Sequence, residues 1–266
     1  MRRENRALAY VVLSVGAVVG GLMFAAGGFA IREDPSSGTP SIWSEATTPP
    51  APTTVESTQA PPPTTAPPTF PQHGEGTFRR ATGSAKRVGT GRVLRYRVEV
   101  ERGLDQEPAE FAQWVDRILA DQRGWTAGGQ WAFQRPAGGS VDFIVKLASP
   151  DTVDEICGRY GLDTGGEVSC RGQENVVINV KRWVLATPAY QGNVDMYRHL
   201  VVNHEVGHFL GHGHVTCPGK GRPAPVMQQQ IYGMGGCVPN GWPYPRPAGI
   251  DGEPYWGGPA APAGRA

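Results

Sequence analysis

One histidine-rich stretch constrains the fold of this chain most, because its side chains are spaced to hold a single metal ion. On a helix of about 3.6 residues per turn, His204 and His208 stand one turn apart on the same face, with Glu205 beside them. Gly211 tolerates the left-handed conformation that ends a helix, and the turn that follows would bring His214 to the same ion. Three neutral imidazoles leave the fourth tetrahedral position open, which is typical of catalytic zinc sites. The stretch therefore predicts a helix, a glycine turn and a Zn2+ site.

Two further histidines lie close to this pattern in the sequence. His212 would be the next imidazole on the same face only if the helix continued, so the predicted turn makes it a non-ligand. His199 precedes the motif by more than one helical turn, and we expect it to be an ordinary surface histidine.

The pattern His-Glu-x-x-His-x-x-Gly-x-x-His resembles the extended zinc signature of the metzincin metalloproteases. A second feature of that clan is a methionine-bearing turn under the metal, and Met227 within Pro225–Gln230 is similar to it in position. Several metzincin families carry a tyrosine two residues after this methionine; here Gln229 stands there, and Tyr232 is a candidate to take its place. Over residues 195–232 the chain looks most like the uncharacterised extracytoplasmic metzincin-like proteins of actinobacteria.

The resemblance implies an α+β fold, in which a twisted mixed sheet with one long helix and the zinc-binding helix precedes a short, loop-rich lower subdomain that contains the methionine turn. It also implies a role for each residue of the motif. These roles are metal ligation by His204, His208 and His214, general base catalysis by Glu205, and structural support by Gly211 and Met227.

The periodicity of apolar residues predicts the elements around the motif, in an order that fits an α+β layer. Alternating residues predict one strand, helical spacing after Pro108 predicts an amphipathic helix that ends near Gly124, and β-prone residues predict two more strands, the second stopped by Pro188. After Gly211 little regular structure is indicated. The expected strands are Val93–Glu101, Val141–Ala148 and Asn175–Leu185, and the expected zinc helix is Val194–Leu210.

The N-terminal end predicts a membrane segment. Residues 7–31 form an uncharged, mostly apolar run, and about 20 such residues span a bilayer. Arg2, Arg3 and Arg6 precede the run and would keep residues 1–6 in the cytoplasm, with the rest of the chain outside. A cleaved signal peptide is the alternative, because small residues near the end of the run suit a signal peptidase, and the protein would then be secreted. We expect a single-pass cell-membrane protein with an extracytoplasmic C-terminal domain.

Composition separates this domain from its flanks. Residues 32–75 are rich in Pro, Thr, Ser and Ala and carry too little apolar surface to offset chain entropy, so they are expected to form a disordered stalk. Residues 76–247 are long enough for one domain with a core of its own, and residues 248–266 read as a Gly- and Pro-rich tail.

The 4 cysteines all follow the apolar run, and disulfides are expected outside the cytoplasm. Of the three possible connectivities, we expect the sequence-local one, which joins Cys157 to Cys170 and Cys217 to Cys237. Zinc ligation by these cysteines is the alternative, although the chain contains no Cys-x-x-Cys spacing.

Charge excludes one class of function. Lys and Arg number 25 against 24 Asp and Glu, so the chain lacks the electrostatic footprint of a nucleic-acid-binding protein.

The motif favours a zinc endopeptidase in which Glu205 takes a proton from a water activated by zinc, acting on peptide or protein substrates outside the cell. By resemblance, an edge strand before the zinc helix, expected at residues 175–185, would pair with an extended substrate.

Two alternatives stay open. A zinc amidase or peptidase acting on cell-wall peptides would use the same metal chemistry in a narrower cleft, and a zinc-stabilised binding module would need no catalysis at all. Glu205 argues against the binding module, because a structural zinc site needs no general base. The sequence carries no signal for an oligomeric state.

Overall fold

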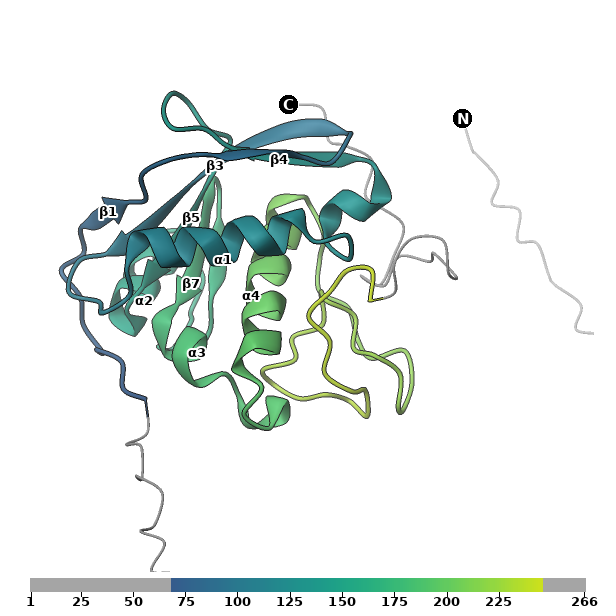
Figure 1. Ribbon diagram of the computed structural model, residues 1–266. Helices are drawn as coiled ribbons and strands as arrows, with labels where there is room; N and C mark the ends of the chain where they lie inside the picture. Colours follow the sequence, from purple (N-terminus) through teal and green to yellow (C-terminus); the bar gives the residue numbers. More distant parts are fainter. Residues whose placement is uncertain (1–67, 246–266) are drawn as a thin grey trace, which may run out of the picture. The chain divides into compact units, whose positions relative to one another are not determined.

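A seven-stranded mixed sheet forms the framework of the protein. The computed structural model describes residues 68–245 (Figure 1). The strand order is β2-β4-β3-β5-β7-β6, and β1 pairs with β3. The pairs β3–β4, β3–β5 and β5–β7 are parallel, whereas β1–β3, β2–β4 and β6–β7 are antiparallel. The strands are β1 Phe78–Arg80, β2 Ala85–Val88, β3 Arg92–Glu101, β4 Trp131–Arg135, β5 Phe143–Ala148, β6 Cys170–Gly172 and β7 Asn175–Asn179.

Helices cover both faces of this sheet, so the expected α+β class is confirmed. The α-helices are α1 Pro108–Ala120, α2 Pro150–Gly158, α3 Val180–Leu185 and α4 Val194–Phe209, and the short 3-10 helices are η1 Trp125–Gly128 and η2 Pro188–Tyr190. Helices α1 and α4 share one apolar core with the sheet, while α2 packs on the other face, over β6 and β7. Two faces of the central strands are therefore protected from water, and α4 is held firmly against one of them.

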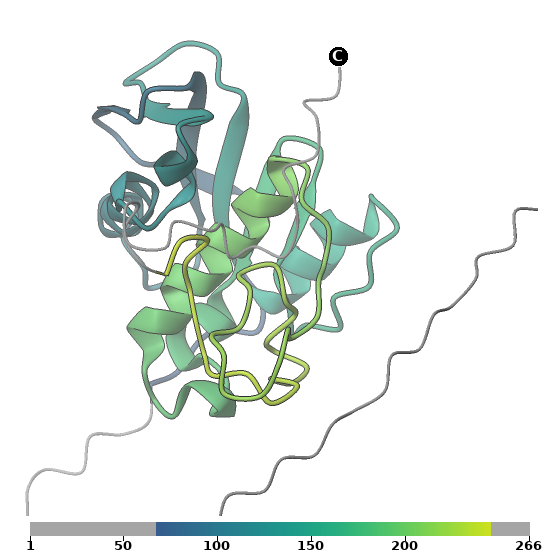
Figure 2. The same cartoon turned by 90° about the vertical axis from the view of Figure 1, so that its right-hand side faces the viewer.

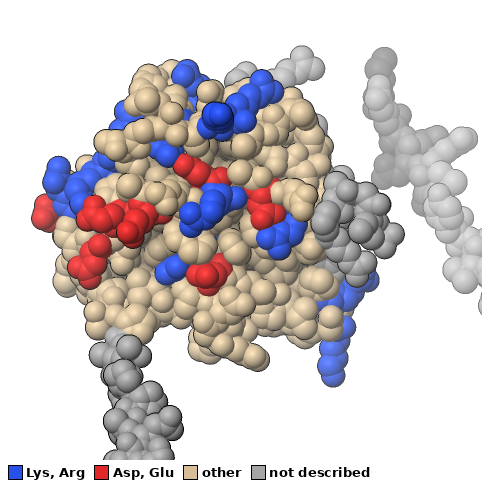
Figure 3. Space-filling model, viewed as in Figure 1, with Lys and Arg blue, Asp and Glu red and all other residues tan. Residues whose placement is uncertain are grey.

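Residue patterns explain β3 and α1. In β3 the alternate residues Leu94, Tyr96 and Val98 are buried, whereas Arg95 is exposed, as expected for a half-buried strand. In α1 the apolar positions face the core, although the helix ends at Ala120 and not near Gly124. On the face that carries α1, Lys and Arg side chains lie among Asp and Glu side chains (Figure 3), which fits the balanced charge of the chain.

The predicted strand at residues 175–185 is wrong in its second half. Strand β7 stops at Asn179, and Val180–Leu185 is the helix α3. The Asn179 side chain accepts a hydrogen bond of 3.0 Å from the backbone N–H of Lys181, which caps the helix start, and both Val180 and Trp183 are buried on its inner side. A local side-chain cap and tertiary packing thus override the β-propensity of this segment.

The edge of the sheet also differs from the expectation. Strand β6 pairs antiparallel with β7, so β7 is an inner strand and cannot offer a free edge to a substrate. The strand that ends the sheet on this side is β6, Cys170–Gly172. It lies beside α4, the helix that carries the histidine motif.

Loops follow α4, and they pack along it (Figures 1 and 2). The chain segment from Gly241 to Tyr244 belongs to this packing, since a β-carbon at Gly241 would lie 2.8 Å from the backbone O of Met196, and Trp242 and Tyr244 are buried. The disulfides Cys157–Cys170 and Cys217–Cys237 are present, in the sequence-local pairing that we expected. The first links α2 to β6, and the second closes the loops after α4.

The packed region includes residues before 76, within the segment that was expected to be part of the stalk. Phe70 packs against the core, and the backbone N–H of Gly74 donates to Ser149 Oγ at 3.0 Å. The apolar run 7–31, most of the stalk and the tail 248–266 lie outside the described residues. Within residues 68–245, no helix is long and apolar enough to cross a bilayer.

Candidate metal centre and cleft

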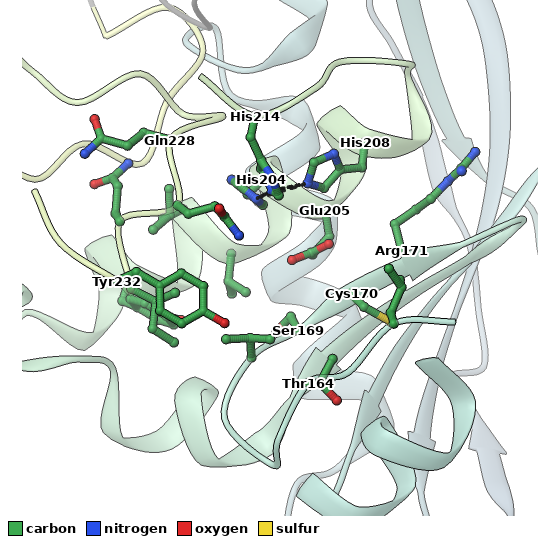
Figure 4. A pocket seen from close by; sticks show the side chains of 18 of the residues that line it. Thr164, Ser169, Cys170, Arg171, His204, Glu205, His208, His214, Gln228 and Tyr232 are labelled. Carbon is green, nitrogen blue, oxygen red and sulfur yellow. Dashed lines mark hydrogen bonds between the residues drawn. The ribbon is translucent and has the colours of Figure 1, made fainter. Parts of the chain in front are cut away.

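Three imidazole nitrogens meet at the C-terminal half of α4 (Figure 4). The Nε2 atoms of His204 and His208 are 3.2 Å apart, and His214 Nε2 lies 3.3 Å from the first and 3.0 Å from the second. Zinc binds imidazole nitrogen at about 2.0–2.1 Å, which places tetrahedral ligands about 3.3 Å from one another. The donor set and its spacing therefore fit one Zn2+ ion, and the side chains are the three that the sequence indicated.

Backbone carbonyls orient two of these rings. His204 Nδ1 lies 2.8 Å from the carbonyl O of Val226, and His208 Nδ1 lies 2.9 Å from that of His212. A carbonyl oxygen only accepts, so each Nδ1 carries the proton and each Nε2 keeps its lone pair. Burial, more than the neighbouring imidazoles, lowers the pKa of His204 to about 3 and that of His208 to about 4. Both rings are therefore neutral, the form that binds a metal.

Gly211 ends the helix as the sequence predicts. Its φ is +94°, its N–H donates to the His208 carbonyl at 3.1 Å, and the N–H of His212 donates to the Gly207 carbonyl at 3.0 Å. These two bonds form a Schellman turn, which reverses the chain and brings His214 back to the helix face. The His212 ring is turned away and stacks on Trp125, with centroids 4.7 Å apart, so His212 contributes its carbonyl and not its imidazole.

Met227 lies under the helix at this point. Its side chain is fully buried, and a β-carbon added to Gly207 would lie 2.4 Å from Met227 Sδ. The Met227 carbonyl also accepts a hydrogen bond of 3.2 Å from the N–H of Val215, the residue after His214. The segment around Met227 thus contacts the helix backbone and the loop that carries the third histidine.

Glu205 lies beside the three histidines and is only 5% exposed. Burial raises the pKa of its carboxyl group to about 8. A carboxylate whose proton affinity is raised near neutrality is suited to take up and release a proton. His199, in contrast, packs on Trp242 with centroids 4.5 Å apart and is not part of the histidine cluster.

A cavity of about 350 Å³ opens next to the histidines. One part of its wall is apolar and comes from α4 and from the loops on either side of it. Two of the apolar side chains, Leu162 and Tyr232, are 42% and 70% exposed, so the cavity is bordered by apolar groups in contact with solvent. The apolar lining residues are Leu162, Val168, Tyr197, Leu200, Val201, Ile231 and Tyr232.

Another part of the wall is the edge strand β6, which contributes Cys170 and Arg171, and polar loop residues complete the lining. Arg171 is near enough to His208 for its charge to be one of the smaller causes, after burial, that keep the pKa of that ring low. Among the loop residues of the wall, the sequence singled out only Gln229 and Tyr232, through the resemblance. The others and strand β6 were missed, because loops and a strand of 3 residues carry no periodicity. The position of Arg171 next to Cys170, which was expected to form a disulfide, is the one local signal.

The described domain can be assigned to a protein family. No curated protein and no solved structure matches the chain. Residues 64–245 match a family described as a protein of unknown function, DUF3152. This match covers most of the chain and includes every residue of the metal centre and the cleft. The chain therefore belongs to the DUF3152 family.

Proposed function

We propose that this protein is a zinc-dependent endopeptidase of the metzincin type, anchored in the cell membrane by residues 7–31 with its domain outside. The observation that carries the proposal is the meeting of three Nε2 atoms within 3.0 to 3.3 Å beside the buried carboxyl group of Glu205. The mixed sheet, the long helices α1 and α4 and the loop segment with Met227 support the metzincin resemblance.

His204, His208 and His214 would hold the ion, and Glu205 would act as the general base. When bound, zinc lowers the pKa of a water molecule and polarises the carbonyl of the scissile bond. Glu205 accepts the proton of the attacking water and then donates it to the leaving amine. Its burial supports this role, because desolvation raises the proton affinity of the carboxylate and so makes it a stronger base.

The cleft favours a peptide substrate over a small molecule. Strand β6 ends the sheet next to the histidines, and an extended peptide can add to such an edge by backbone hydrogen bonds. The cavity beside it offers apolar walls for one substrate side chain. An open strand edge with a side-chain cavity is what an endopeptidase needs, whereas an amidase for a small cell-wall peptide would be expected to have a closed pocket.

The test uses the full chain loaded with Zn2+ and a mixture of unstructured peptides, with cleavage products identified by mass spectrometry. We expect cleavage within the peptides, its loss with a chelator, and recovery on adding zinc. Glu205→Gln should retain one zinc per chain and lose activity by about 10² or more. Glu155→Gln is the matched control, because Glu155 is an exposed residue of α2 that pairs with Arg159 at the surface.

Each contrary result points to a different conclusion. Cleavage of cell-wall peptides alone would favour the amidase. Wild-type turnover by Glu205→Gln would remove Glu205 from the mechanism. Stoichiometric zinc without hydrolysis of any peptide or cell-wall fragment would favour the binding module.

A further inference from the structure

Arg171 lies on the α4 side of the sheet and at the wall of the cleft because of its place in β6. Side chains alternate along a strand, and Cys170 belongs to the small apolar cluster on the α2 side of the sheet. Gly172 faces the same side, since a β-carbon there would lie 2.0 Å from the Tyr160 ring. Arg171 stands between them and so faces α4, where its guanidinium lies 5.9 Å from the centre of the Phe209 ring.

The guanidinium of Arg171 lacks a carboxylate partner. Its Nε atom is buried without a hydrogen-bond partner, and Arg171 forms no ion pair with any Asp or Glu of residues 68–245. Every other arginine that is buried or half-buried in this part of the chain does form one. These paired arginines are Arg79, Arg97, Arg123, Arg135, Arg182 and Arg198.

An unpaired, partly buried cation is costly, so the position calls for a compensating group. The Phe209 ring stabilises this charge only weakly, because 5.9 Å is close to the limit of about 6 Å at which a cation and an aromatic ring attract each other. Arg171 lines the cavity, so a group brought in by the substrate can reach it. A carboxylate suits a guanidinium best, because it accepts two parallel hydrogen bonds and balances the charge.

The two ends of the cleft have different chemistry. Leu200 and Val201 lie about one turn before His204 on α4 and form part of the apolar wall. Phe209, which Arg171 contacts, follows His208 at the other end of the motif. In Figure 4 the histidines accordingly lie between Arg171 on one side and Tyr232 on the other.

We propose that Arg171 is a specificity-determining residue that binds a carboxylate of the substrate, so that this protein acts on peptides with an acidic group on the Phe209 side of the scissile bond. The inference rests on the proposed endopeptidase function. The carboxylate is either an Asp or Glu side chain or the free end of a short peptide, and a site built to bind it rejects analogues without the charge.

The experiment uses the full chain with zinc and three matched sets of decapeptides. The first set has blocked ends and a single Glu scanned through the positions, the second has Gln in its place, and the third has Gln and a free C-terminal carboxylate. We expect kcat/KM for Glu to exceed that for Gln by about tenfold or more at one position. A preference for the third set would identify the terminal carboxylate as the source.

Substitutions of Arg171 test whether the preference for Glu over Gln depends on this residue. Arg171→Met keeps the length of the side chain and should bring the ratio for Glu over Gln near one, while kcat/KM for the Gln peptides changes by less than about threefold. Arg171→Glu should favour Lys at the same position. Arg159→Met is the matched control, because Arg159 is an exposed arginine that does not line the cavity, and it should keep the wild-type ratio.

A binding measurement separates failure of this inference from failure of the proposed function. Fluorescence anisotropy with labelled peptides and Glu205→Gln needs no hydrolysis. Cleavage without a preference for a carboxylate overturns the role of Arg171 and leaves the endopeptidase intact. If no peptide is cleaved, the endopeptidase fails, and tighter binding of the carboxylate peptides that disappears in Glu205→Gln/Arg171→Met still supports the site. Equal binding of all three peptide sets, or no binding of any set, overturns the carboxylate site at Arg171.

Discussion

Replacing Gly207 by alanine tests how the methionine segment supports the metal centre. Gly207 lies inside α4 between two zinc-ligand candidates, and alanine in a helix interior is favoured over glycine by about 1 kcal/mol. The added β-carbon, however, would lie 2.4 Å from Met227 Sδ and 2.7 Å from Trp125 Cζ2. Neither neighbour moves freely, because Met227 is fully buried and Trp125 Nε1 donates to the Asn203 carbonyl at 2.9 Å.

The gain in helix propensity and the steric overlap oppose each other, and we expect the cost of the overlap to be larger. Forcing a methyl group into a filled core costs about 1 to 3 kcal/mol, so we expect Gly207→Ala to lower the free energy of unfolding by about 1 to 2 kcal/mol, or a few degrees in Tm. A displaced Met227 would also move the adjacent Val226 carbonyl, which holds His204 Nδ1 at 2.8 Å. Loss of such an orienting bond typically weakens metal binding by about tenfold or more.

Thermal melting and zinc titration of Gly207→Ala measure both effects. Gly158→Ala is the matched control, since Gly158 ends α2 and a β-carbon there meets nothing within 4 Å, so this change should be neutral or stabilising. Met227→Ala removes the side chain that the added methyl group would meet, so Gly207→Ala should lower the free energy of unfolding by less in that background. If Gly207→Ala were as stable as the wild type and bound zinc equally well, Met227 would not support the helix as we describe.

Further substitutions test the rest of the metal centre. His214→Ala should lose stoichiometric zinc in elemental analysis while His212→Ala keeps it, and the reverse result would show that the third ligand is misassigned. Gly211→Ala should cost about 1 kcal/mol through its positive φ alone, because the space around it is open; a more stable protein in thermal melting would rule out the turn. Replacing Cys217 and Cys237 by alanine opens a loop with a sequence separation of 20, which should cost about 3 kcal/mol and weaken zinc binding; unchanged melting and zinc titration would mean that this disulfide does not hold the methionine segment.

The cluster of three histidines was predictable because its geometry is local. Helical spacing places His204 and His208 on one face, and a single rule about glycine places the turn that carries His214. The strand predicted for residues 175–185 was wrong in its second half for the opposite reason. Its β-branched residues suit a strand, but the burial of Val180 and Trp183 depends on tertiary packing, which propensity does not report. The cap at Asn179 is a local signal that the strand prediction did not use.

Strand β6, which forms part of the cleft wall, could not be predicted for a related reason, although the position of Arg171 next to Cys170 is a partial signal. A strand of 3 residues is marginal by itself, and its register with β7 is a tertiary property. The disulfide from Cys157 to Cys170 ties this strand covalently to α2, which limits how far the edge can move when a peptide adds to it. Arg171 is the next residue, so the same bond also restrains the backbone that carries this arginine. A cysteine adjacent to an arginine, upstream of the histidine motif, is therefore the pattern by which the proposed carboxylate site can be sought in other members of the family.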